Sequence, residues 1–281
     1  MGKALNNYAD WRLGESLRDY DFYFQQFKQM ITNMFIWENL PDNISQRFLE
    51  EHLFNEGMVL FFKSSDLDIH VVSKALTIGL NDYEEPTLYH ALGVNKINEV
   101  LSPSECVPIW NTNFRKGSVD TVHFFAKRLS GIEKTIDVNL EQLKNPSIIA
   151  CPEGQRETVK QIIKEKSDGV PYIFTSDDFD GMVKVNVFDM HVQNHTRELE
   201  EIRMSKEHQA LTYFGINNVN ILKKERLVSG EAEQNNEQIS INRNAMFQSR
   251  LRACKEINEM FGLNVNVRYN ADICGVFGYD E

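Results

Sequence analysis

The strongest pattern near the start of the chain is helical, with apolar residues recurring every three or four positions. It predicts a helix with one wide buried face over Tyr20–Glu38. Because proline disfavours helical geometry in the residue before it, we expect that helix to end ahead of Pro41. A second helix is predicted from the candidate N-cap Ser45 through Asn55, with Gly57 as its stop.

Short segments rich in β-branched and aromatic residues come next. They predict four strands, at Met58–Lys63, His70–Leu80, Leu88–Val94 and Val107–Asn111. Together with the two helices, these strands predict a mixed α/β unit in the first part of the chain.

Two long helical patterns with narrow apolar stripes lie in the middle of the chain. The first covers Ser118–Asn145, and its roughly 28 residues make a rod of about 42 Å. The second covers Met190–Phe214, and its other faces are charged. A compact monomer of this size has little with which to cover two such rods, so we expect identical neighbours to pack alongside them.

The segment between the two rods, residues 147–188, has the pattern of a small βαββ module. Its predicted elements are, in order, a strand, a helix and two strands, at Ile148–Cys151, Gln155–Lys166, Val170–Thr175 and Met182–Phe188. This module interrupts the two rods as a separate small unit.

The stretch after the second rod, Asn217–Ile241, is polar and has no sustained periodicity. We expect a long loop there, and such a loop inside a domain is usually functional or mobile. A further amphipathic helix is predicted over Asn244–Phe261, ended by Gly262 and followed by a strand over Leu263–Tyr269.

Composition narrows the function classes. The net charge is −11, with 41 acidic against 30 basic residues, so the chain is not expected to hold duplex DNA tightly over its whole surface. An acidic wall would nevertheless let DNA slide past without sticking. No apolar run reaches the roughly 18 residues of a membrane-spanning helix, so no membrane partner is expected. The four cysteines are scattered singly, which favours neither a disulfide framework nor a zinc site and fits a reducing cytoplasm.

The chain has no recognisable catalytic motif. It lacks a phosphate-binding loop, a dinucleotide fingerprint and a nucleophile elbow, so no cofactor is expected. The pair His191 and His195 stands four apart on a predicted helix, but without the glutamate of a zinc-protease motif. A solvated helix face is the favoured interpretation. The alternative is a soluble metal-dependent hydrolase that uses this pair and the nearby carboxylates Glu198, Glu200 and Glu201.

Three cations, Lys223, Lys224 and Arg226, lie close together inside the predicted loop. Taken alone they are best interpreted as a solvated charge cluster. Acidic residues follow at Glu231 and Glu233, so the cluster is a poor stand-alone nucleic-acid patch.

Two stretches of the chain together resemble a known family. The first is Phe35–Pro41, and the second runs from Tyr213 to Tyr269. Within the second, the segments that carry the likeness are Phe214–Asn220, Lys223–Arg226, Asn235–Ile239, Ser249-Arg250, Ala253–Glu259 and Phe261–Val267. Both stretches are similar, in order and in spacing, to the upper collar, or head–tail connector (portal), protein of small protein-primed short-tailed podophages.

The resemblance implies an α+β, portal-type fold assembled into a ring, with twelve copies. It implies an N-terminal arm, a two-part α/β wing that ends in a short C-terminal tail, two stem helices, a narrow βαββ clip and a channel loop. These parts map, in chain order, to residues 1–19 (arm), 20–117 (wing), 118–145 (stem), 146–189 (clip), 190–216 (stem), 217–241 (channel loop) and 242–281 (wing and tail). On this mapping Lys223, Lys224 and Arg226 lie where DNA passes and would contact its phosphates without reading sequence.

The function that the resemblance implies is a non-enzymatic conduit for packaging and ejecting double-stranded DNA, joining head to tail. Its implied partners are the major capsid and scaffolding proteins, the packaging ATPase and the lower collar or tail proteins. Its implied place is the portal vertex of the virion, after assembly in the host cytoplasm. The first 21 residues hold only three cations against four acids, which leaves a packaging RNA in doubt.

Overall fold

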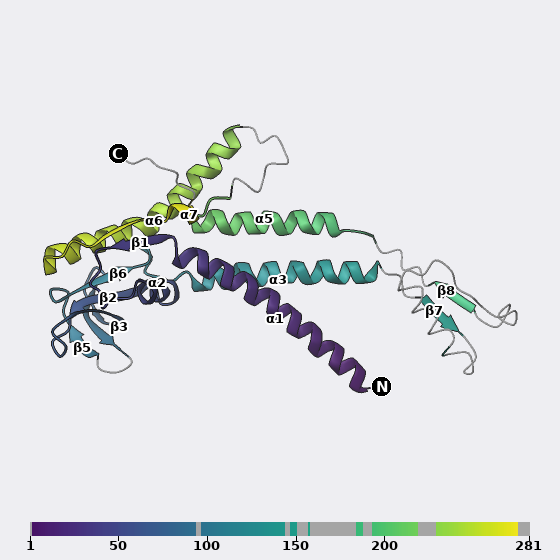
Figure 1. The fold of residues 1–281 in the computed structure, drawn as a ribbon, viewed down its shortest axis with the longest axis horizontal. Coiled ribbons are helices and arrows are strands. Elements are labelled where there is room, and N and C mark those ends of the chain that lie inside the picture. The colour runs from purple at the N-terminus through teal and green to yellow at the C-terminus, as the bar shows by residue number, and fades with distance from the viewer. Residues whose placement is uncertain are drawn as a thin grey trace. The chain divides into compact units, whose positions relative to one another are not determined.

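The computed structural model describes residues 2–93, 97–143, 147–150, 157, 184–187, 193–218 and 229–274. The chain divides into two compact units. One comprises Met1–Gly131 with Ile202–Glu281, and the other is Ile132–Glu201. Figure 1 shows the elements of each unit.

The first helix, α1 (Gly2–Thr32), begins well before the predicted Tyr20 and also ends earlier than predicted. The prediction of helix through Glu38 is wrong, because Phe35–Glu38 forms strand β1. This strand pairs antiparallel with β9 (Asn266–Tyr269). A partner strand so distant in sequence stabilises an extended Phe-Ile-Trp-Glu segment that local periodicity assigned to the helix.

The first unit contains a five-stranded antiparallel sheet with the strand order β5-β4-β3-β2-β6. Its strands are β2 (Met58–Lys63), β3 (His70–Leu80), β4 (Pro86–Leu92), β5 (Asn98–Leu101) and β6 (Cys106–Trp110). The predicted β2 and β3 are confirmed at both ends, and β4 and β6 within two residues. The short edge strand β5 was not predicted.

Helix α2 (Gln46–Asn55) confirms the predicted second helix and its cap. The Ser45 hydroxyl accepts a hydrogen bond from the amide of Phe48 at 3.4 Å. The chain then turns at Gly57, whose φ of +82° suits glycine. Local signals therefore set both ends of this helix.

Three long helices complete the first unit or lead out of it. They are α3 (Val119–Gln142), α5 (Thr196–Phe214) and α6 (Ser229–Phe261), and a short helix α7 (Ala271–Cys274) follows β9. The predicted rods are confirmed as α3 and α5, although residues 193–195, within the predicted range of the second rod, precede the first turn of α5.

The expected loop over Asn217–Ile241 is wrong from Ser229 onward, because α6 already begins there. This part of α6 has no apolar stripe, but it is rich in good helix formers such as Ala232, Glu233 and Gln238. Polar contacts to α5, described below, substitute for a hydrophobic face. The remainder of the expected loop, residues 219–228, lies outside the described residues.

The core of the first unit lies on both faces of strand β2. Val59 and Phe61 face a large cluster formed with α1, α2, α3, α5, α6 and β9. Leu60 and Phe62 face a smaller cluster on the other side of the sheet. All four side chains are fully buried, which explains the uninterrupted apolar run of this strand. Figure 1 shows α6 running beside this sheet.

The second unit contains the ends of α3 and α5 and the antiparallel strands β7 (Ser147–Ala150) and β8 (Lys184–Val187). These strands confirm the first and last strands of the predicted βαββ module. Its predicted helix Gln155–Lys166, apart from the helical Glu157, and its strand Val170–Thr175 lie outside the described residues.

Candidate functional site

The predicted channel-loop cations Lys223, Lys224 and Arg226 lie outside the described residues. The structure does describe the two flanks of their segment, which are the end of α5 with Ile216–Asn218 on one side and α6 on the other. These two flanks form the base of the candidate site.

The two flanks are joined by three polar side chains that we call the loop foot: Thr212, Asn218 and Asn235. The Asn218 amide donates to the Thr212 hydroxyl at 2.9 Å and to the His208 carbonyl at 3.0 Å. Asn235 donates to the Asn218 side-chain carbonyl at 2.8 Å, and Thr212 donates to that of Asn235 at 3.1 Å. The three bonds that join Thr212, Asn218 and Asn235 to one another form a closed triangle. Asn218 is only 2% exposed. A buried amide is stable only when satisfied in this way.

A second set of contacts holds the end of α5 against α6. Asn242 donates to the Thr212 carbonyl at 2.9 Å, and the buried Arg243 donates to the Gly215 carbonyl at 2.7 Å. Gly215 has a φ of +75°, and a Cβ placed there would lie 2.6 Å from the Arg243 backbone nitrogen. Only glycine permits this approach.

These contacts join the two flanks of the segment 219–228, which itself lies outside the described residues. Fixing the ends lowers the conformational entropy that a ligand contact must overcome. Sequence periodicity missed the loop foot because its contacts are polar. The available signal was the asparagine-rich composition of Asn217-Asn218 and Asn235-Asn236, within segments that carry the resemblance.

A buried ion pair lies deeper in the same unit. Glu50 of α2 and Arg250 of α6 are 2% and 1% exposed. Their two hydrogen bonds measure 2.9 Å (Nε to Oε1) and 2.7 Å (Nη2 to Oε2). This is the bidentate geometry in which a guanidinium and a carboxylate interact most strongly.

The remaining polar atoms of the pair are also satisfied. The Trp37 indole donates to Glu50 at 2.8 Å, and Arg250 donates to the Asn111 carbonyl at 3.2 Å. The guanidinium also lies over the Phe35 ring, 4.4 Å from its centroid. The two stretches that carry the family resemblance, Phe35–Pro41 and the C-terminal one, therefore meet at this pair.

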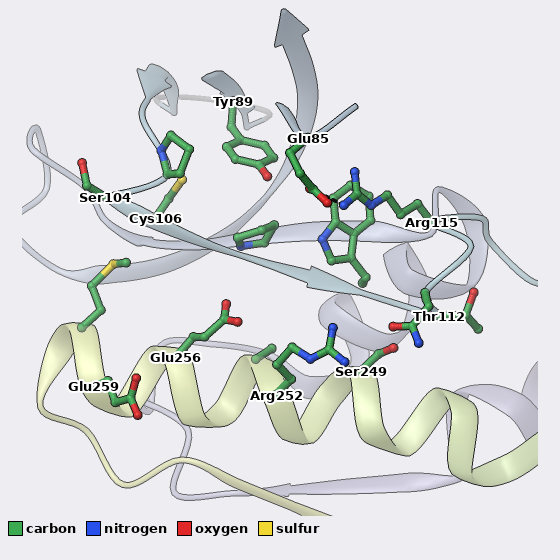
Figure 2. A pocket seen from close by; sticks show the side chains of 16 residues that line it. Glu85, Tyr89, Ser104, Cys106, Thr112, Arg115, Ser249, Arg252, Glu256 and Glu259 are labelled. Carbon is green, nitrogen blue, oxygen red and sulfur yellow. Dashed lines mark hydrogen bonds and ion pairs between the residues drawn. The ribbon is translucent and has the colours of Figure 1, made fainter. Parts of the chain in front are cut away.

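A groove of about 920 Å³ lies between α6 and the β4 and β6 side of the sheet. Figure 2 shows Arg252 and Glu256 of α6 facing Tyr89, Glu85 and Arg115. Arg115 forms an ion pair with Glu85. Its guanidinium also lies over the ring of Trp110, 4.8 Å from the centroid.

The ionisable groups of the groove are not arranged for nucleophilic chemistry. Burial, the largest effect, raises the pKa of Tyr89 to about 12 and that of the Cys106 thiol to about 12. Burial also raises the pKa of Glu256. Since the thiolate is the reactive form of cysteine, this raised pKa disfavours reaction of Cys106 near neutral pH.

The histidine pair of the hydrolase alternative is only partly described. His191 lies outside the described residues, whereas His195 is half exposed and its Nδ1 lies 3.0 Å from the Glu198 carboxylate. Within the described part of the chain, no three His, Cys, Asp or Glu side chains are grouped as metal ligands would be.

None of the helices that the structure describes is both long and apolar enough to cross a membrane.

The chain is similar to several solved structures to different degrees. A chain of the portal and tail of native bacteriophage P68 is 15% identical, with a TM-score of 0.55 over 94% of this chain and 90% of that chain. A HK97-family portal protein from Corynebacterium diphtheriae is 7% identical (TM-score 0.44, 89% and 92% covered). A chain of the native gene transfer agent virion is 10% identical (TM-score 0.47, 90% and 81% covered). The P68 likeness confirms the portal-type α+β fold.

A family model supplies the identity that fold alone does not. The model described as Phage Connector (GP10) matches residues 7–274 of the 281. It confirms the resemblance found in the two sequence stretches and gives the hydrolase alternative no support. The chain therefore belongs to the phage connector family, and it is a portal-type structural protein of the virion rather than an enzyme.

Proposed function

We propose that twelve copies of this connector protein form a ring through which double-stranded DNA passes, and that Lys223, Lys224 and Arg226 contact that DNA from the channel loop. The loop foot carries this proposal. It ties the two flanks of the segment with three buried or half-buried polar side chains, which supports a loop that begins and ends at one place. Because α6 begins at Ser229, the proposed loop comprises residues 217–228.

The charge distribution supports weak contacts rather than tight binding. A net charge of −11 per subunit opposes adhesion of DNA to the protein as a whole. Three cations per copy supply sequence-independent phosphate contacts. We assign to them the hindrance of backward slippage of packaged DNA.

We assign the remaining partners to the clip and the wing. The clip, residues 146–189, faces the packaging ATPase and later the lower collar or tail proteins, while the wing contacts the capsid and scaffolding proteins. The separate compact unit Ile132–Glu201 supports a clip that is distinct from the wing. A packaging RNA is not part of the proposal, since residues 1–21 are not basic.

The test replaces the three cations together, as Lys223→Ala, Lys224→Ala and Arg226→Ala. We expect rings of normal mass, twelve times the 32.6 kDa subunit, but particles that lose packaged DNA. Ring mass is measured by native mass spectrometry, and retained DNA by nuclease protection of purified particles. Particles that retain DNA like the wild type would refute the role of the loop.

A matched pair of asparagine variants tests the loop foot itself. Asn235→Ala removes two bonds of the triangle, whereas Asn236→Ala makes the same change at the neighbouring exposed position. We expect DNA loss with the first variant alone. Equal behaviour of the two variants would separate the loop foot from DNA retention.

A further inference from the structure

The sheet face that packs on the large core at β2 continues outward over β3, β4 and β5, where several apolar side chains are exposed. These side chains come from the outer halves of β3, β4 and β5. We call this part the bare sheet face, formed by Leu76 (59% exposed), Ile78 (41%), Leu80 (63%), Leu88 (38%) and Val100 (55%).

The strand register places these side chains next to one another. Ile78 is the cross-strand partner of Leu88, and His90 lies between Leu76 on one side and Val100 on the other. The alternate positions point the opposite way, where Tyr89 and Leu101 are buried in the small core and Thr77 is exposed. An antiparallel sheet usually turns a polar face to water, so these exposed apolar side chains around His90 mark a contact surface.

Contacts at the turn hold the hairpin that carries this face. Arg115 binds the Glu85 carboxylate and donates to the Glu84 carbonyl at 3.4 Å, next to the groove of Figure 2. The Asn81 side chain accepts from the amides of Tyr83 and Glu85, both at 2.9 Å, and so closes the turn. Among the residues that the structure describes, the apolar face therefore remains exposed.

The net charge of the chain indicates which partner covers the bare sheet face. Copies of a chain with a net charge of −11 repel one another, and the repulsion is weakest where carboxylates are absent. None of the side chains that form the bare sheet face is a carboxylate, and at its border the carboxylate of Glu56 is paired with Lys74 at 3.2 Å. This face is thus a surface on which another acidic copy can dock at low electrostatic cost.

We infer that the bare sheet face packs against a second copy of this chain as one side of the subunit contact in the ring. This inference rests on the proposed ring. A ring of more than two copies requires two different complementary surfaces on each subunit, and this face supplies one of them.

The test compares Leu76→Glu with Thr77→Glu in the full chain. Both positions are exposed neighbours on β3, but Thr77 lies on the opposite face of the strand. A ring contains the change at every contact, and a carboxylate buried there without a partner is costly. We expect subunit association about a hundredfold weaker with Leu76→Glu, equivalent to two factors of ten in the equilibrium constant. Association with Thr77→Glu should stay close to wild type.

The readouts are native mass spectrometry for assembly and circular dichroism for the fold of each variant. Folded Leu76→Glu subunits that still form rings would overturn the inference and leave the proposed function standing. A wild-type protein without rings would overturn both.

Hydroxyl-radical footprinting of wild-type rings keeps the inference testable even if Leu76→Glu fails to fold. The peptide containing Leu76–Leu80 should be oxidised more slowly in rings than in dissociated subunits. Equal oxidation in the two states would exclude the bare sheet face from the subunit contact.

Discussion

The buried ion pair of Glu50 and Arg250 is the residue-scale feature on which the first unit depends. Each charge is satisfied only by the other and by a few fixed donors and acceptors, such as Trp37 and Asn111. An isolated charge at either position would have no water to solvate it.

Replacing one partner should therefore destabilise the subunit strongly. We expect Arg250→Met or Glu50→Gln to lower the free energy of unfolding by about 3–5 kcal/mol, and the double variant to lose less than the sum. Denaturant unfolding followed by circular dichroism measures this. The control is Arg47→Met, which removes an exposed ion pair to Glu51 of similar length, 2.8 Å, and should cost less than about 1 kcal/mol. Simple additivity in the double variant would contradict the coupling.

Residue-scale features were predictable where the signal was local. Ser45 and Gly57 could be recognised because a cap and a turn depend on neighbouring residues alone. The Glu50–Arg250 pair could not, since its partners lie 200 positions apart and a charged residue in a helix pattern usually faces solvent. The loop foot was missed for the same reason, because its bonds join α5 to α6 across the undescribed segment.

At the scale of elements, two glycines set the distance between the end of α2 and the segment that precedes α3. A Cβ on Gly57 would lie 2.5 Å from the Gly117 nitrogen, and one on Gly117 would lie 2.5 Å from the Phe54 carbonyl oxygen. The Ser118 amide donates to that same carbonyl at 2.8 Å. These close contacts fix where α3 begins relative to the end of α2.

The close contact at Gly57 predicts that alanine destabilises the protein to different extents at two glycines that both have positive φ. Gly57→Ala incurs the left-handed backbone cost and a backbone clash, so we expect a loss of about 2–4 kcal/mol. The Cβ added by Gly262→Ala would have no heavy atom within 4 Å. We therefore expect the free energy of unfolding to fall by about 1 kcal/mol, from the φ of +66° alone. Thermal unfolding of the two variants compares them, and equal losses would mean that the close contact at Gly57 has room to relax.

Predictability at this scale followed the kind of contact that each element makes. Strands β2 and β3 and helices α2, α3 and α5 carry their burial pattern in their own sequence, so they were predicted. Strand β1 exists because β9 pairs with it, and the first turns of α6 are held by polar contacts. Neither strand pairing nor polar contacts produce a periodic pattern of apolar residues in the sequence.

At the scale of the whole molecule, the family membership was predictable from sequence, whereas the proposed subunit contact was not. The bare sheet face became apparent only when the register aligned Leu76, Leu88 and Val100 across three strands. In the sequence, the same residues are scattered among polar neighbours and resemble those of an ordinary half-buried sheet.

The acidic charge and the apolar contact together predict the salt response of the ring. Added salt screens the repulsion between copies but hardly affects an apolar contact. We expect the ring fraction, measured by native light scattering, to rise as ionic strength increases from about 10 mM to about 150 mM, where the screening length shortens to about 8 Å. Dissociation on adding salt would indicate that ion pairs, rather than apolar packing, hold the subunits together.

The pairing of β1 with β9 also governs when a newly made chain can fold. Strand β1 and Glu50 emerge early from the ribosome, yet their partners, β9 and Arg250, are synthesised near the end. A chain released prematurely keeps an unpaired strand and an uncompensated buried charge, so it cannot complete the core of the first unit. The first unit can therefore complete its core only after the C-terminal part of the chain has been synthesised.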